Sequence, residues 1–119
     1  MQPLPAPGAR LEEDGRCTFT VWAPFAQSVE VELLDGSRPA RRAPLQRDDR
    51  GYHTAALKGV DQGGAYQFVL DGEKVRPDPA SRWQPESVRG PSAVVSPQFR
   101  WTDVGWRNPP LSEYVIYEL

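Results

Sequence analysis

The chain has 119 residues, enough for one domain with a usable hydrophobic core. Its formal net charge of −2, without any basic block, disfavours a nucleic-acid partner and an anionic membrane surface. We expect a cytoplasmic protein with no membrane segment. The N-terminus lacks a signal-peptide pattern, no stretch approaches the ~20 apolar residues of a membrane helix, and the lone Cys17 cannot form an internal disulfide.

Seven short stretches show strand patterning. In residues 16–23, Cys17, Phe19 and Val21 alternate with more polar neighbours, which is typical of a half-buried β-strand. Asp-Gly pairs between the stretches favour tight turns. The predicted strands are residues 9–12, 16–23, 28–34, 41–47, 52–57, 65–70 and 73–76, with a brief extended segment at 93–95.

Short strands with frequent turns and no convincing helix predict an all-β fold. We expect an immunoglobulin-like antiparallel β-sandwich, without the paired cysteines of antibody domains. The predicted division is a flexible lead at 1–8, the sandwich at 9–96 and a further segment at 97–119.

The stretch PDPASRWQPESVRGPS, residues 77–92, combines four prolines with the guanidinium of Arg82, the indole of Trp83 and the amide of Gln84. Prolines fix φ and remove backbone donors, so we expect an irregular, stiff crossing rather than a helix or central strand. On composition alone this is a domain linker. The candidate site residues for substrate binding or a domain interface are Asp78, Arg82, Trp83 and Gln84. Asp78, between two prolines, is expected to cap a turn rather than to catalyse.

This ordered stretch resembles the P-D-P-A-S-R-x-Q-P-x-G-V-H-G-P-S signature of malto-oligosyltrehalose trehalohydrolases, a branch of the α-amylase superfamily (glycoside hydrolase family 13). Ser87 and Arg89 stand where that family has Gly and His. The run Phe19-x-Val21-Trp22-Ala23-Pro24 and the later Gly64-x-Tyr66-x-Phe68 are similar to the N-terminal sandwich of the same superfamily. The shorter Asp78-Pro79-x-Ala core is also shared by branching and debranching enzymes.

The resemblance implies an early-set sandwich resembling carbohydrate-binding module family 48. It also implies that 97–119 is a linker followed by the first strand of a (β/α)8 barrel, with Val115-Ile116-Tyr117-Glu118-Leu119 as that strand. The family hydrolyses the α-1,4 bond that joins terminal trehalose to a malto-oligosaccharide. The implied partners are therefore a catalytic barrel of the same polypeptide and an α-glucan-type substrate. The family's catalytic carboxylates belong to the barrel, beyond Leu119.

The residues themselves predict no catalytic or metal site and no cofactor. His53 is the only histidine and is expected to be a surface or half-buried strand residue, and Cys17 is expected in the core. The fragment alone is therefore expected to be inactive. Arg82 is expected to bridge to a barrel carboxylate or a backbone carbonyl, with Trp83 packed beside it.

Aromatic platforms for sugars are the remaining possibility. Trp22 is expected to pack on its sheet, and LLDGSRPARR, residues 33–42, lacks the aromatic run of glycogen-binding relatives, which argues against independent glucan affinity. Two alternatives stay open. One is the N-terminal domain of a glycogen debranching or branching enzyme, and the other is a free-standing starch- or glycogen-binding module.

Overall fold

A computed structural model describes residues 2–119, so that Met1 lies outside the described residues. The elements are the strands β1 (Gly8–Leu11), β2 (Arg16–Trp22), β3 (Val29–Asp35), β4 (Arg38–Pro44), β5 (Gln46–Arg47), β6 (Tyr52–Lys58), β7 (Ala65–Leu70), β8 (Lys74–Arg76) and β9 (Ser92–Ala93), and the short 3-10 helix η1 (Leu111–Glu113).

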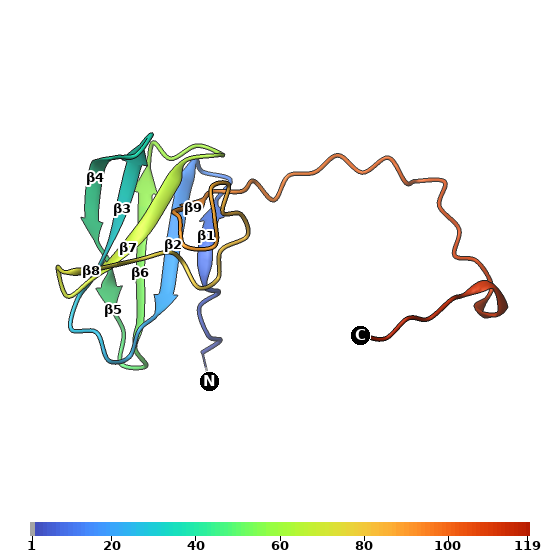
Figure 1. Cartoon of the computed structure of the whole chain (residues 1–119), viewed down its shortest axis with the longest axis horizontal. Coiled ribbons are helices and arrows are strands. Elements are labelled where there is room, and N and C mark those ends of the chain that lie inside the picture. The colour runs from blue at the N-terminus through green and yellow to red at the C-terminus, as the bar shows by residue number, and fades with distance from the viewer. Residues whose placement is uncertain (1) are drawn as a thin grey trace.

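The strands form two antiparallel sheets packed face to face, which confirms the predicted sandwich (Figure 1). One sheet has the order β1-β2-β6-β5, and the other has the order β4-β3-β7-β8 with β9 also paired to β7. The core lies between them. Alternate residues of β2, such as Phe19, meet alternate residues of β7, such as Tyr66 and Phe68, as the period-two pattern requires.

Three buried aromatic rings form the centre of this core. The ring centroids of Phe19 and Tyr66 lie 5.0 Å apart, and those of Tyr66 and Phe68 lie 5.9 Å apart, both edge to face. This is the geometry that aromatic quadrupoles favour. Tyr66 thus joins the two sheets while its hydroxyl reaches beyond the apolar core, which matters for the site described below.

One predicted strand is wrong in its extent. Residues 41–47 were expected to form a single strand, but the chain changes sheets there: β4 pairs with β3, and β5 pairs with β6. Leu45, between them, is buried and donates its amide to the Val29 carbonyl at 2.9 Å. The polar, proline-bounded β4 lacks the apolar alternation that would have marked its pairing in advance.

The hairpin between β7 and β8 shows why the turn residues matter. Asp71 and Gly72 both have positive φ, 52° and 72°, and the Glu73 amide donates to the Leu70 carbonyl at 3.1 Å, so a tight turn connects the two strands. The Asp71 Oδ1 also accepts hydrogen bonds from the amides of Gln27 and Ser28, at 2.7 and 3.1 Å. One side chain therefore fixes the β2–β3 connection to this hairpin, at the same end of the sandwich.

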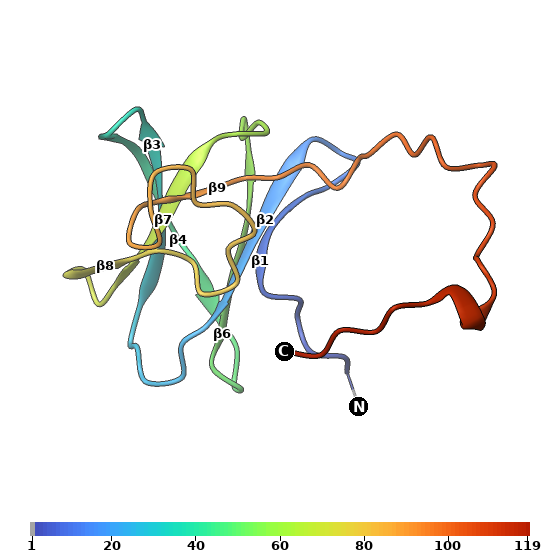
Figure 2. The same ribbon diagram turned by 45° about the vertical axis from the view of Figure 1, so that its right-hand side comes forward.

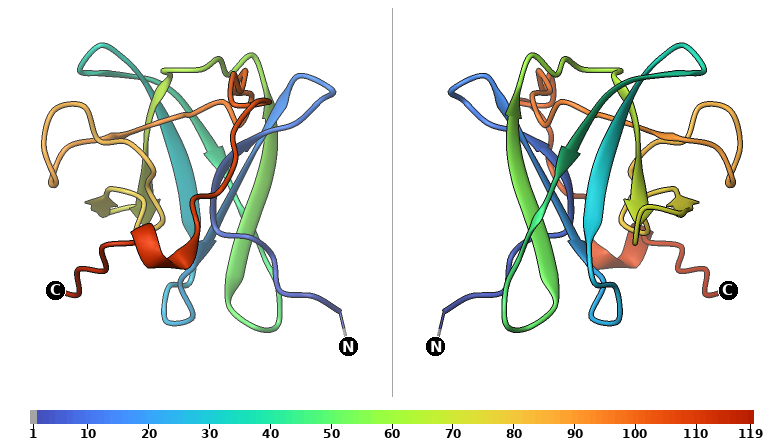
Figure 3. Two further views of the ribbon diagram at one scale, coloured as in Figure 1. Left: turned by 90° about the vertical axis from the view of Figure 1, so that its right-hand side faces the viewer. Right: turned by 90° about the vertical axis from the view of Figure 1, so that its left-hand side faces the viewer.

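The proline-rich crossing segment, residues 77–92, runs from β8 to β9 along one side of the sandwich (Figure 3, olive to orange). The chain then leaves near the β1–β2 hairpin, and residues 97–119 extend away from the sheets (Figures 1 and 2). Residues 114–119 form no strand there. Within residues 2–119, no helix has the length and apolar character that crossing a bilayer would need.

Candidate functional site

Asp78 is the buried anchor of the crossing segment. Its side chain accepts a hydrogen bond from the Tyr66 hydroxyl at 2.6 Å and another from the Ala80 amide at 2.8 Å, and its own amide donates to the Ser92 hydroxyl at 3.2 Å. Only 3% of the residue is exposed. Both carboxylate oxygens are occupied, so Asp78 holds the turn, as expected from the flanking prolines.

Burial sets the protonation of this pair. It raises the pKa of the Asp78 carboxyl, although the Tyr66 hydroxyl, the Ala80 amide and the Arg82 charge oppose that shift. Burial, reinforced by Asp78, also raises the pKa of the Tyr66 phenol, so that Tyr66 stays a donor. The buried Asp78 carboxyl group, with Tyr66 and Ala80 as its donors, therefore positions the backbone of the crossing segment.

Arg82 binds within the sandwich. Its Nη1 donates to the Ala9 carbonyl on β1 at 3.2 Å, and the residue is otherwise exposed. This is a backbone carbonyl, one of the two kinds of acceptor expected, but it belongs to the same domain. The contact ties the crossing segment to the edge strand of the first sheet. A bridge from Arg82 to a barrel stays a prediction.

Gln84 organises the second half of the crossing segment. Its Nε2 donates to the carbonyls of Val88 and Gly90, at 3.0 and 3.2 Å, and so closes the loop between them. Beside it, the Trp83 carbonyl accepts a 2.8 Å hydrogen bond from the Ala93 amide of β9, while the residue as a whole is 49% exposed. Trp83 therefore contributes its backbone to the fold and leaves its indole at the surface.

A surface pocket of about 490 Å³ lies between the ends of β2, β3 and β7 and the crossing segment. Core side chains such as Val29 and Phe68 form part of its lining, and the crossing segment supplies another part. Of the four predicted site residues, Asp78 and Gln84 line this pocket, and Arg82 and Trp83 do not. The pocket is also lined by Trp22, whose position the sequence reasoning missed.

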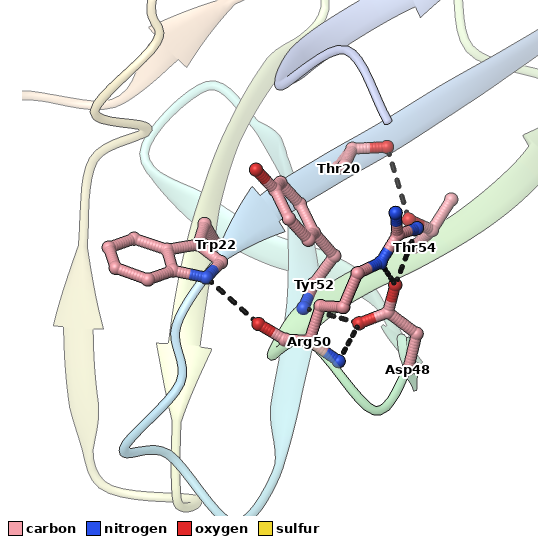
Figure 4. A network of polar contacts seen from close by, with 6 residues as sticks. All are labelled: Thr20, Trp22, Asp48, Arg50, Tyr52 and Thr54. Atoms are coloured by element: carbon pink, nitrogen blue, oxygen red, sulfur yellow. Dashed lines mark hydrogen bonds and ion pairs between the residues drawn. The ribbon is translucent and has the colours of Figure 1, made fainter. Parts of the chain in front are cut away.

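Trp22 was expected to pack on its sheet, but the residue is 58% exposed at the end of β2. Its indole Nε1 donates to the Arg50 carbonyl at 3.0 Å, which fixes the ring by one edge (Figure 4). The alternation of β2 contained the missing signal. Trp22 is in phase with Thr18 and Thr20, on the face opposite to the core, and the next two residues end the strand.

The turn before β6 holds the Arg50 carbonyl, the acceptor for Trp22, in place (Figure 4). Asp48 accepts hydrogen bonds from the amides of Arg50 and Tyr52, both at 2.9 Å, and forms an ion pair with the Arg50 guanidinium at 3.1 Å. Desolvation opposes ionisation, but these donors hold the pKa of the Asp48 carboxyl below its usual value. Tyr52 is the direct cross-strand partner of Trp22. The Arg50 guanidinium carbon lies 5.8 Å from the ring centre of Tyr52.

A close backbone approach completes this corner. Gly51 has φ of 88°, and its carbonyl accepts the Ala23 amide at 2.9 Å. A Cβ at this position would lie 2.7 Å from the Cα of Pro24, closer than side chains tolerate. Only glycine therefore lets the β5–β6 turn pack against the end of β2, and this packing brings the Arg50 carbonyl within reach of Trp22.

The other candidate reactive residues lie in the core. His53 is fully buried rather than half-exposed, because it faces inward; its Nε2 is 3.2 Å from the Ala23 carbonyl, and its Nδ1 has no partner within residues 2–119. Cys17 is fully buried, as expected, and burial raises the pKa of its thiol to about 11, which suppresses the nucleophilic thiolate. What the surface offers is binding: an edge-fixed indole beside a pocket.

Comparison with known proteins places these features in a family. The family model of carbohydrate-binding module 48 (isoamylase N-terminal domain) matches residues 7–89. The malto-oligosyltrehalose trehalohydrolase of Saccharolobus solfataricus is 41% identical over 112 residues, covering 94% of this chain and 19% of the relative. The 1,4-alpha-glucan branching enzyme GlgB 2 of Xanthomonas euvesicatoria is 33% identical over 113 residues, covering 83% of this chain and 15% of the relative.

A solved structure of a Salmonella typhimurium protein described as an alpha amylase superposes with a TM-score of 0.81 at 33% identity, covering 96% of this chain and 19% of that one. The chain thus spans 15–19% of the length of these relatives. The resemblance read from the crossing segment and from β2 is confirmed, and the chain belongs to the carbohydrate-binding module 48 family, the isoamylase N-terminal domain.

Proposed function

We propose that this chain is the non-catalytic sandwich domain of a malto-oligosyltrehalose trehalohydrolase, which releases trehalose by hydrolysing the α-1,4 bond next to the terminal trehalose. One observation carries the proposal. The similarity to the Saccharolobus solfataricus trehalohydrolase extends over 94% of the chain, past the family model's limit at residue 89 and into the tail. The match to the Xanthomonas euvesicatoria branching enzyme also extends past residue 89, but its identity is 33% rather than 41%, and the higher identity favours the trehalohydrolase.

The exposed apolar surface of residues 97–119 supports the same proposal. Trp101, Trp106, Val115 and Ile116 are all largely exposed, and an apolar run of this kind is typical of a segment that packs against further protein. The proposed partner is a catalytic (β/α)8 barrel of the same polypeptide, with residues 97–119 as linker and first barrel strand, after a lead at 1–8 and a sandwich at 9–96. The α-glucan substrate would then be bound mainly by the barrel.

In this proposal the crossing segment is the rigid side of the domain junction. Asp78, Arg82, Trp83 and Gln84 hold its backbone, and the exposed Trp83 ring is offered to the barrel. A cytoplasmic location belongs to the same proposal, since the chain's single thiol, Cys17, needs no oxidising compartment.

A pair of chimeras tests the proposal. In the Saccharolobus solfataricus trehalohydrolase, the matching region is replaced by this chain, and trehalose release from malto-oligosyltrehalose is measured. Because the domain contacts would be compatible, we expect a rate within about tenfold of the parent enzyme. The chain alone is the blank, and we expect it to release no trehalose.

The second chimera addresses the alternative that the similarity to the Xanthomonas euvesicatoria branching enzyme favours, namely a branching-enzyme domain. The same chain replaces the matching region of that enzyme, and branching of a linear α-glucan is measured. We expect a much lower activity, or a lower melting temperature, than in the parent. A chimera active only in the branching enzyme would reverse the assignment, and inactivity of both would favour a free-standing module.

A further inference from the structure

We propose that the pocket beside Trp22 is a protein-docking site that receives an apolar side chain of the catalytic barrel, with a carboxylate of the barrel beside it. The inference rests on the proposed function and adds a second contact to the domain junction. The tail leaves the sandwich near the β1–β2 hairpin, whereas the pocket opens at the other end, where β2 stops (Figures 1 and 2). The crossing segment connects the two regions, because Pro77, Gln84 and Val88 line the pocket.

Three large apolar residues are exposed at this end of the sandwich. Trp22 is 58% exposed, Val88 is 83% exposed, and Phe25, in the connection between β2 and β3, is 97% exposed. Trp22 and Val88 line the pocket, and Phe25 follows shortly after the lining residue Ala23. Exposed apolar residues gathered around an apolar hollow are typical of a surface that another protein surface covers.

Most polar groups of the pocket are already used inside the domain. The Trp22 Nε1 donates to a backbone carbonyl, both Asp78 oxygens accept internal hydrogen bonds, and the Gln84 Nε2 donates to two carbonyls. A polar ligand would leave many of its own hydrogen-bonding groups unpaired here, which costs free energy. Apolar walls such as Val29 and Phe68 suit an aliphatic or aromatic side chain instead. Side chains inserted into such pockets carry much of the binding energy of protein interfaces.

Arg76 sets the charge expected of the docked surface. It lines the pocket and is exposed, its Nη1 donates to the carbonyl of the adjacent Val75 at 2.8 Å, and it has no ion-pair partner within residues 2–119. The other charged lining residue, Asp78, is buried and hydrogen-bonded internally. A carboxylate beside the inserted apolar side chain would therefore pair with Arg76, and electrostatic complementarity of this kind fixes the register of an interface.

The barrel is the occupant that the chain itself favours. The match covers only 19% of the Saccharolobus solfataricus trehalohydrolase, so most of that polypeptide is further protein. The connection is long enough, because residues 97–119 span roughly 75 Å when fully extended, whereas the seven residues of β2 span roughly 23 Å. A domain joined through this tail can therefore reach the end of the sandwich where the pocket opens. Covalent attachment also gives it a high effective concentration there.

Thiol labelling tests the proposal in two proteins that both contain Val88→Cys, namely the 119-residue chain and the trehalohydrolase chimera described above. Maleimide labelling of residue 88 is followed by mass spectrometry of its peptide. We expect labelling to be at least about tenfold slower in the chimera, because docking covers the introduced thiol. Cys17 is fully buried and should stay unlabelled in both proteins, which reports intact folding. Ala40→Cys, at an exposed position of β4, is the matched control and should react equally fast in both.

Charge reversal tests the carboxylate of the barrel. In the chimera with Val88→Cys, Arg76→Glu should raise the labelling rate at least about threefold, because it opposes like charges. Arg38→Glu, which reverses another arginine without an ion-pair partner within residues 2–119, should leave the rate unchanged. An unchanged rate in Arg76→Glu would refute the carboxylate contact.

Equal labelling of residue 88 in the chain and in the chimera would overturn the docking proposal. Trehalose release by the same chimera is measured in parallel, so that the two proposals can fail separately. An active chimera with an accessible thiol would refute the docking alone. A protected thiol in a chimera that releases no trehalose would count against the proposed function and leave the docking intact.

Discussion

The crossing segment, residues 77–92, and the tail, residues 97–119, are both irregular and both contain prolines, yet their relations to the sandwich differ. The crossing segment is bound to distant strands through Asp78, Arg82 and Trp83. Every hydrogen bond of the tail is local, such as those from Trp106 to Asp103 and Asn108. Proline content stiffens a chain, but long-range polar contacts are what fix its position.

The comparison also separates two kinds of tryptophan. Trp22 and the tail residue Trp106 both donate from Nε1, the first to a carbonyl 28 residues away and the second to a side chain two residues away. Only the first bond orients a ring relative to a pocket. Exposure alone, 58% and 69%, would not have distinguished them.

The largest expected effect is that of Asp78→Ala. The change leaves the buried Tyr66 hydroxyl and Ala80 amide without their acceptor, so the free energy of unfolding should fall by about 2–4 kcal/mol. The measurement is thermal or urea unfolding. Asp103→Ala, an aspartate of the tail, is the matched control and should change it by less than ~0.5 kcal/mol. Similar losses from both variants would abolish the distinction between the two segments.

A pH titration of stability sharpens the same comparison. Because burial raises the pKa of Asp78, the folded state retains its proton to a higher pH than the unfolded state does. The contribution of Asp78 to the free energy of unfolding is therefore greatest at low pH and falls as the pH rises from 3.8 through the folded pKa. We expect this decline in the unmodified chain relative to Asp78→Asn, measured by urea unfolding at several pH values. A difference that increased with pH would contradict it.

A smaller effect is expected for Gln84→Ala. The variant removes two hydrogen bonds that close the loop before Gly90, and it should destabilise that loop by about 1 kcal/mol. Amide hydrogen exchange should become faster between residues 85 and 90 with little change in the sheets. Gln98→Ala in the tail serves as the control, because its side chain has no hydrogen bond within residues 2–119. Unchanged exchange in Gln84→Ala would show that the prolines alone hold the loop.

The smallest effect is expected for Arg82→Lys in this chain. The guanidinium makes one 3.2 Å bond to Ala9 from the surface, so its loss should lower stability by roughly 0.5 kcal/mol. Arg107→Lys in the tail should have no measurable effect. If Arg82 also contacts a barrel, the same substitution in the complete enzyme should cost clearly more, which melting temperatures of both forms would reveal.

The sandwich was predictable from the sequence because its strands alternate clearly and its turns carry the required residues. Phe19 and Phe68 indicate which faces of their strands lie in the core, and Asp71-Gly72 indicates the hairpin between β7 and β8. The inward position of His53 was not predictable by the same reasoning. Its strand, YHTAALK, is hardly more apolar on one face than on the other, so the phase was ambiguous.

The candidate site was predictable only in part. Asp78 was expected to hold a turn because prolines flank it, but its partner Tyr66 is assigned to the core by the sequence pattern, and its hydroxyl reaches Asp78 only in the folded chain. Trp22 was missed because the bond that orients it comes from Arg50, on a turn that glycine packing brings close. Such contacts depend on the docking of distant turns, which local patterns do not encode.

The edge strand β4 has a consequence for self-association. It lies at the outside of its sheet, and its seven residues include three arginines and two prolines. An identical edge approaching from a second molecule would meet the like charges of Arg38 and Arg41, which have no ion-pair partner within residues 2–119, and the prolines, which lack an amide donor. The β4 edge, the longest exposed edge of the sandwich, is therefore a poor template for strand addition. We expect the sandwich to resist edge-to-edge association with a second molecule at this strand.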